Sequence, residues 1–156
     1  MMNDNEPIGL LIGAVRRRIK QAVGTHVRRY SLTTQQFWLL VAISEHPGFS
    51  VRQLATHLRM DEPTASRLIA ALVRRRLVQI KDDDSDRRRA HIHLRANGTA
   101  LAAELQQVAA SMRGAVIEGL TTEEQRTLRT ALRKIIANMD RVHASATTMQ
   151  QARNGK

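Results

Sequence analysis

Apolar residues recur at steps of three and four along most of this chain of 156 residues, which is the spacing of helices with one buried face. The first run predicts a long helix from Ile8 to about Ser31. Shorter helices are expected where capping residues precede further apolar runs, at Thr33 or Thr34, at Ser50, and at Asp61 or Glu62. Two longer helices follow, one from about Ala96 and one after the capping sequence Leu120–Glu124.

The apolar period changes to two between the fourth and fifth predicted helices. Residues 78–80 and 90–94 alternate as short strands do, and an acidic turn that runs into Arg87, Arg88 and Arg89 separates them. Two short helices joined by a tight turn, then a strand, a charged turn and a strand, are typical of a winged helix-turn-helix. Arginines at the tip of such a wing can enter a DNA minor groove. A solvated surface hairpin is the alternative, and the helix-turn-helix turn itself lacks glycine.

The charge of the chain indicates a negatively charged partner but does not show which kind. A formal net charge of +11 and a pI of about 11.5 favour a polyanion, whether DNA, RNA or an anionic membrane. Aromatic residues make up 3% of the chain, which argues against stacking platforms for single-stranded nucleic acid.

Several function classes are excluded by what the sequence lacks. Without cysteine there is no disulfide, thiol catalysis or thiol redox sensing. No apolar run is long enough to span a bilayer, and residues 1–9 do not read as a secretory signal, so we expect a cytoplasmic protein with no membrane partner. No nucleophile motif or glycine-rich phosphate loop is present, so we expect neither an enzyme nor a cofactor.

Five segments, in order and at suitable spacing, resemble the MarR family of transcription regulators. They are Leu32–Phe37 with Pro47–Ser50, Val51–Ala55, the wing sequence Asp83–Arg88 (usually D-P-x-D-R-R), Leu94–Gly98 (usually L-T-x-x-G) and Leu120–Glu124. The resemblance covers about residues 8–143. Two positions depart from the family pattern, because Asp84 replaces a proline in the wing turn and Arg95 replaces a threonine that caps the next helix.

The resemblance implies a mainly α fold with a small β wing, a winged helix-turn-helix flanked by terminal dimerisation helices. We expect a flexible N-terminus over 1–7, a single domain over 8–146, and a flexible tail over 147–156. Within the domain, residues 8–30 and 96–146 would form the dimerisation helices, and 33–95 the DNA-binding lobe. The apolar surface of the terminal helices also favours a homodimer over an intramolecular bundle.

The helix that opens at Pro63 is the expected recognition helix. Arg67 suits bidentate bonding to guanine, although a phosphate clamp is the alternative for it. Thr64 and Ser66 offer hydroxyls, and Ala65 offers a methyl to thymine wherever it is not buried. Ser50 and Gln53 are expected to bind phosphate at a helix N-terminus.

The wing supplies the second set of DNA contacts. By the resemblance, Arg88 enters the minor groove, Asp86 orients a wing arginine, and Arg87 and Arg89 contact phosphate or pair with Asp86. The run Arg74–Arg76 stays open between a solvated helix end and further DNA contact.

MarR-like dimers release DNA when a small molecule binds between the dimer region and the DNA-binding lobe. The residues that suit an aromatic carboxylate or phenol here are His26, Arg29, Tyr30 and Trp38, with core packing as the alternative for each. Of the six histidines, His91 and His93 share one strand face but lack a carboxylate or cysteine at ligand spacing, so we expect no metal there.

The sequence therefore predicts a dimeric, sequence-specific DNA-binding regulator, a repressor released by a small aromatic or phenolic effector. Its expected partners are double-stranded DNA with an inverted repeat, a second copy of the chain, and the small aromatic ligand. The alternatives are a non-specific architectural DNA-binding protein and a metal-responsive regulator of the same fold.

Overall fold

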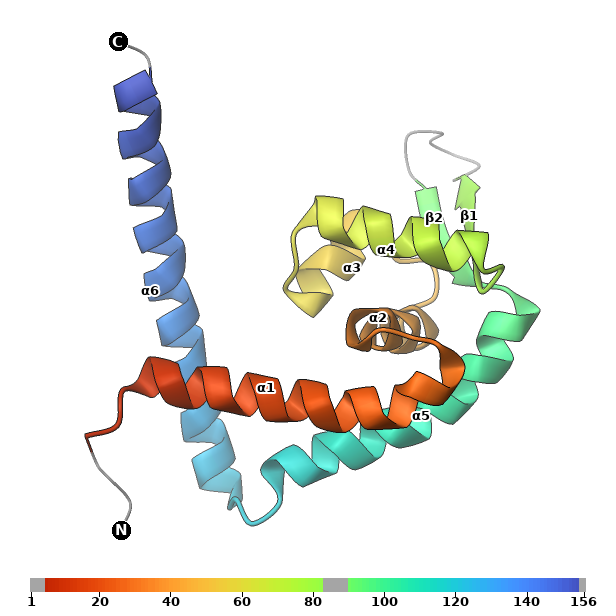
Figure 1. Cartoon of the computed structure of the whole chain (residues 1–156), viewed down its shortest axis with the longest axis horizontal. Helices are drawn as coiled ribbons and strands as arrows, with labels where there is room; N and C mark the ends of the chain where they lie inside the picture. Colours follow the sequence, from red (N-terminus) through yellow and green to blue (C-terminus); the bar gives the residue numbers. More distant parts are fainter. Residues whose placement is uncertain (1–4, 83–89, 155–156) are drawn as a thin grey trace. The chain divides into compact units, whose positions relative to one another are not determined.

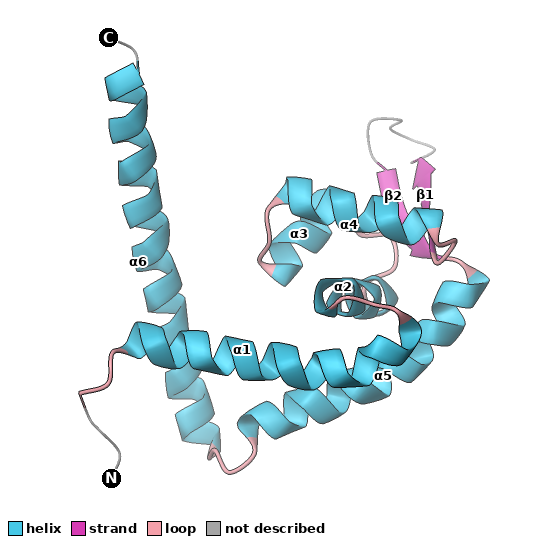
Figure 2. Ribbon diagram, viewed as in Figure 1, coloured by secondary structure: helices cyan, strands magenta, loops and turns pink. Residues whose placement is uncertain are grey.

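The computed structural model describes residues 5–82 and 90–154 of the chain. In chain order the elements are α1 (Ile8–Val27), a 3-10 turn (Arg28–Tyr30), α2 (Thr34–Glu45), α3 (Val51–Leu58), α4 (Glu62–Arg74), β1 (Val78–Asp82), β2 (Ala90–Leu94), α5 (Ala96–Ile117) and α6 (Thr122–Asn154). Helices make up most of the described chain, and the two strands lie beside α4 (Figure 2). The predicted mainly α winged helix-turn-helix is confirmed.

The chain divides into two compact units, residues 1–116 and residues 117–156. The second unit holds α6, which begins with the capping interaction predicted at Thr121 and Glu124. The sequence predicted that this helix ends near Ala146, but α6 continues to Asn154, because residues 149–153 (Met-Gln-Gln-Ala-Arg) are good helix formers. None of the helices in the described ranges is long and apolar enough to cross a membrane.

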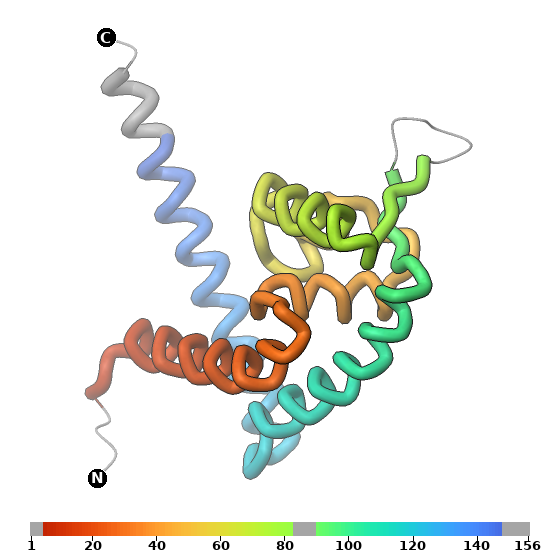
Figure 3. The backbone as a smooth tube through the Cα atoms, turned by 45° about the vertical axis from the view of Figure 1, so that its right-hand side comes forward, coloured from red at the N-terminus to blue at the C-terminus, as the bar shows by residue number. Residues whose placement is uncertain are grey.

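The core of the first unit is built around α2. Five consecutive residues of α2, Leu39–Ile43, are buried together with Phe37, so this helix is enclosed on nearly every side. It lies between α1 and the α3–α4 pair, as the two views in Figures 1 and 3 show. The sequence analysis expected a single buried face for this helix. A helix that is buried on most sides instead carries a continuous apolar run and lacks a polar stripe.

The helices between residues 33 and 95 begin at the predicted caps. Thr33 caps α2 and Ser50 caps α3, each with a glutamine that completes a capping box. Between α3 and α4, Arg59 adopts the left-handed backbone conformation (φ 51°), and the amide of Met60 donates to the carbonyl of Ala55. An arginine therefore makes the turn that glycine usually makes at the end of a helix.

The two strands form an antiparallel ribbon in which Val78 faces Leu94 and Asp82 faces Ala90. The base of this ribbon is also tied to the segment between α2 and α3. The amide of Gly48 donates to the carbonyl of Ile92, and the amide of Ile92 donates to the carbonyl of Phe49. Since Ile92 is fully buried, the root of the wing is part of the core.

Candidate nucleic-acid interface

The first turn of α4 carries a chain of three linked side chains. Asp61 caps the helix, because its Oδ1 accepts from the Thr64 amide at 2.7 Å and its Oδ2 accepts from the Thr64 hydroxyl at 2.8 Å. The hydroxyl oxygen of Thr64 in turn accepts from Nη2 of Arg67 at 3.1 Å. The hydrogen bonds from Thr64, hydroxyl first and amide second, lower the pKa of Asp61 from its usual value.

This arrangement fixes the direction of an exposed cation at the predicted reading position. Arg67 and Ser66 are exposed and Thr64 is half-buried. An anchored guanidinium near a helix N-terminus keeps its other donors available for guanine or phosphate. The sequence identified Arg67 and Thr64 separately, but not the hydrogen bond that joins them to Asp61.

One predicted contact in this helix must be corrected. The methyl of Ala65 is fully buried, as are Ile69 and Leu72 one and two turns later. Ala65 therefore lies on the core stripe of α4, which leaves no surface for a thymine methyl. The thymine contact was expected only where this methyl is not buried, and the i, i+4, i+7 spacing of Ala65, Ile69 and Leu72 places it inward.

The side chains at the start of α3 are engaged with each other. The Oγ of Ser50 accepts from the Gln53 amide at 3.3 Å, and Oε1 of Gln53 accepts from the Ser50 amide at 2.9 Å. Since the oxygen of Ser50 is an acceptor in this capping box, a phosphate contact by Ser50 would use its O–H as the donor.

The strands that carry the wing are described, but the wing residues predicted to contact DNA are not. Asp86, Arg87, Arg88 and Arg89 lie outside the described residues. At the other end of α4, Arg75 has a structural partner. Its two terminal nitrogens donate to the carbonyls of Ser31 and Tyr30, both at 2.9 Å, and so fasten the end of α4 to the segment before α2. Sequence reasoning did not foresee this role of Arg75.

The residues proposed for an effector site do not line one cavity. Trp38 borders a cavity of about 670 Å³ whose wall also includes three cations, namely Arg16, Lys20 and Arg28. His26, Arg29 and Tyr30 are not among its lining residues.

Arg29 and Tyr30 instead form a network with Glu104 of α5. The Tyr30 hydroxyl donates to Oε2 of Glu104 at 2.6 Å and accepts from Nη2 of Arg29 at 2.6 Å. The first bond is the main cause of the raised pKa of Tyr30, because a phenolate could not donate to that carboxylate. His26 is exposed near the end of α1. Sequence reasoning found the aromatic residue of the cavity but missed its cations, of which Arg16 and Lys20 lie on α1 and Arg28 lies in the 3-10 turn after it.

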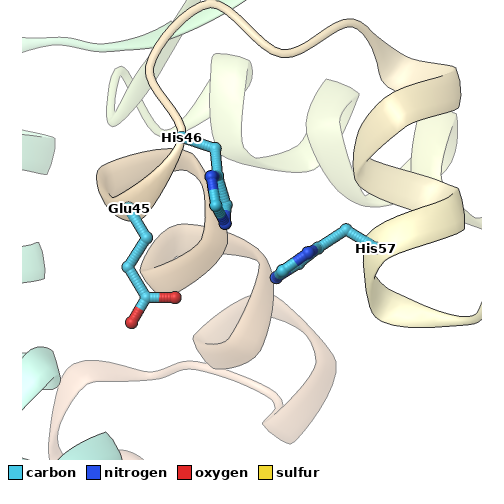
Figure 4. Close-up of side chains that lie close together, drawn as sticks. All are labelled: Glu45, His46 and His57. Carbon is cyan, nitrogen blue, oxygen red and sulfur yellow. The ribbon is translucent and has the colours of Figure 1, made fainter.

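A second group that sequence reasoning missed lies where α2 meets α3. Glu45 and His46 stand at the end of α2, His57 stands in the last turn of α3, and their side chains point toward one another (Figure 4). The sequence analysis considered His91 and His93 instead, because two histidines that are two residues apart on a strand can be recognised from sequence alone. The proximity of His46 and His57 cannot, because it depends on how α2 and α3 pack.

Comparison with known proteins agrees with this geometry. The model of the MarR family matches residues 30–89, the segment from the turn before α2 to the wing. An uncharacterized HTH-type transcriptional regulator of Bacillus subtilis (strain 168), YybA, is 25% identical over 130 residues, which is 83% of this chain and 87% of the relative.

Two solved structures show the same fold. The S. aureus MepR–DNA complex has a TM-score of 0.75 at 23% identity and covers 85% of this chain and 98% of its own. The second structure is that of Bordetella bronchiseptica BpsR, whose DNA binding is regulated by 6-hydroxynicotinic acid. It has a TM-score of 0.71 at 24% identity and covers 86% of this chain and 96% of its own. The matched family and relative are transcription regulators and not enzymes, as predicted. The exposed helix start at Asp61–Arg67, the wing strands and these matches together make the chain similar to the MarR family of DNA-binding winged helix-turn-helix transcription regulators.

Proposed function

We propose that this regulator is a homodimer that reads an inverted repeat with its two α4 helices and represses transcription until a small anionic aromatic molecule binds. The observation that carries the reading of bases is the Arg67–Thr64–Asp61 chain at the exposed start of α4. A guanidinium already held by a neighbouring hydroxyl loses less conformational freedom on binding, so its geometry can discriminate between bases.

Other DNA contacts follow from the position of the lobe around α4. Ser66 is exposed beside Arg67, and the start of α3 offers the O–H of Ser50 and the side-chain amide nitrogen of Gln53 as donors. We assign Arg88 to the minor groove and Asp86 to its orientation by resemblance to the family, with Arg87 and Arg89 toward phosphate. These contacts would supply the part of the affinity that depends strongly on salt.

The dimer is supported by apolar residues that remain exposed on the terminal helices. On α1 they are Ile8, Leu10, Leu11 and Val15, each at least 45% exposed. On α6 they are Leu128, Ile136, Met139 and Val142. Isolated exposed apolar residues are ordinary, but rows of them along two long helices mark an interaction surface. Two-fold symmetric DNA sites also require two recognition helices about 34 Å apart.

The cavity beside α1 and α2 supports the class of effector. Its wall combines the indole of Trp38 with Arg16, Lys20 and Arg28, next to the apolar side chains of Ile19 and Leu32. Aromatic and apolar walls with converging cations suit a small aromatic carboxylate. BpsR, a protein of the same fold, has its DNA binding regulated by such an acid, 6-hydroxynicotinic acid.

Selection of bound DNA from a random pool, followed by titrations at a fixed salt concentration, tests the proposed reading. The expected result is an inverted repeat bound by two chains, at least about a thousandfold more tightly than random DNA. A non-specific architectural protein would enrich no repeat and would bind both DNAs equally. That outcome would remove the proposal in favour of the alternative.

A further inference from the structure

The side chains of Glu45, His46 and His57 converge outside both the DNA-reading surface and the cavity with the three cations. Each offers one ligand atom, and these atoms all lie within 4.8 Å of one another. Among the residues that the structure describes, this is the one group of three such side chains close enough to share a metal ion. Glu45 and His46 lie at the end of α2 and His57 lies in the last turn of α3, so the packing of the two helices brings the three side chains together.

The geometry of the cluster needs little change to hold a cation. Ligand atoms of a tetrahedral Zn²⁺ site lie about 3.3 Å apart, given metal–nitrogen distances near 2.0 Å. Glu45 and His57 are exposed and can rotate to close the remaining gap. His46 is already held, because its ring stacks on Phe49 with centroids 4.5 Å apart and planes 7° from parallel. The ring of His57 meets the ring of His46 edge-on at 4.6 Å.

The carboxylate of Glu45 has a cationic partner that shows its charge state. Arg113 of α5 donates to both carboxylate oxygens, at 2.6 and 3.0 Å, which is the bidentate geometry of an arginine on an ionised carboxylate. The carboxylate is therefore ionised, as a metal ligand must be. A bound cation would take over from Arg113 as the partner of one carboxylate oxygen.

We propose that Glu45, His46 and His57 form a binding site for a divalent first-row transition metal ion such as Zn²⁺. Two imidazoles and one carboxylate are a ligand set that zinc uses in proteins, with the remaining positions held by water. Imidazole ligation favours late transition metals over Mg²⁺ and Ca²⁺. The ion would join the end of α2 to the last turn of α3, the helix that leads directly into the DNA-reading helix α4.

The cluster differs from the histidine pair considered in the sequence. Nδ1 of His91 lies 2.6 Å from the carbonyl oxygen of Gly48, so this nitrogen is already in a hydrogen-bonding position. The ring of His93 lies beside the same glycine. A site on these residues and a site on the cluster can be told apart by substitution.

Zn²⁺ binding to the full chain tests the proposal, after treatment with a chelator and in competition with a chromophoric zinc indicator. We expect one Zn²⁺ per chain, not displaced by excess Mg²⁺, and an affinity at least about tenfold lower in H57Q and in E45Q. The control H143Q removes an exposed histidine of α6 and should bind as the parent does. Circular dichroism establishes that each variant is folded.

Zinc binding that H57Q and E45Q leave unchanged would overturn the proposed site, as would the absence of one-to-one binding in the parent. Loss of binding in H93Q but not in H57Q would place the metal on the wing strand instead. Because the assay contains no DNA, its result is independent of whether the proposed operator reading holds.

Discussion

Gly98 lies against the backbone of Leu77 so closely that a Cβ built on the glycine would stand 2.0 Å from the Leu77 carbonyl oxygen. The same oxygen accepts from the amide of Arg95 at 2.9 Å, so it cannot easily move away. The first turn of α5 therefore packs directly on the segment that joins α4 to β1. A side chain at position 98 would push the first turn of α5 away from the segment that joins α4 to β1.

We expect G98A to lower the free energy of unfolding by about 1–3 kcal/mol, because overpacking against a fixed backbone forces a shift. Urea unfolding followed by circular dichroism measures this change. G114A on the same helix is the matched control, because nothing lies within 4 Å of its added Cβ. That variant should be neutral or stabilised by up to about 1 kcal/mol. Equal effects of the two variants would contradict the close packing.

R67A should cost about 1–3 kcal/mol on the selected operator and relax the choice at one base position in each half-site. T64V removes the hydroxyl that receives the Arg67 guanidinium while leaving the side-chain shape. We expect it to weaken the same base preference, with less than additive loss in the double variant. Titrations of operator and random DNA with each variant decide this. Equal losses on both DNAs would show that Arg67 only holds phosphate.

M139E should convert the dimer to a monomer, because it places a charge in the exposed apolar row of α6. Sedimentation at micromolar concentration gives the mass. T130E is the control on the same helix, since a step of nine residues places Thr130 opposite Met139 around the helix axis. An M139E variant that stays dimeric and binds operator normally would exclude this row from the interface.

K20M should weaken binding of 6-hydroxynicotinic acid, used as a probe aromatic carboxylate, because Lys20 is one of the three cations in the cavity wall. Calorimetry of the DNA-free protein measures the loss, which we expect to be about tenfold, or 1.4 kcal/mol. K134M on α6 is the charge-matched control. Any probe that binds should also lower operator affinity, by linkage. A probe that binds tightly without changing DNA affinity would contradict the proposed switch.

The Glu45–Arg113 ion pair predicts that the free energy of unfolding depends on pH. Glu45 has a lowered pKa in the folded state, so its contribution to stability is present above its unfolded pKa and disappears as the pH falls through the folded one. R113M should therefore destabilise at neutral pH, by less than about 1 kcal/mol for this partly exposed pair, and converge with the parent in acid. Unfolding curves with chelator at several pH values test it. A difference that persists undiminished in acid would point to lost packing of Arg113.

The elements that sequence reasoning placed well are those specified by local signals. Thr33, Ser50 and Asp61 cap their helices as predicted, because a cap needs only a side chain and an amide within three residues. The strands were found from their period of two. Local patterns were therefore enough to predict the order of elements and the start of α4.

Several contacts that sequence reasoning missed join residues far apart in the chain. The sequence carries no mark of Arg75 donating to the carbonyls of Ser31 and Tyr30, or of Arg113 reaching Glu45. Lys20 likewise becomes part of a cavity wall only because α2 lies beside α1, a contact between helices that the sequence does not show.

The pair of backbone hydrogen bonds between Ile92 and the Gly48–Phe49 segment has a consequence for local opening. The amides of Ile92 and Gly48 are both bonded within the lobe, and Ile92 is fully buried. Their hydrogen exchange should therefore need the same opening that separates β2 from the end of α2. The amides of Gly48 and Ile92 would then exchange as slowly as those of the core. The hydrogen bonds that hold β2 against the Gly48–Phe49 segment would therefore persist through smaller openings of the structure.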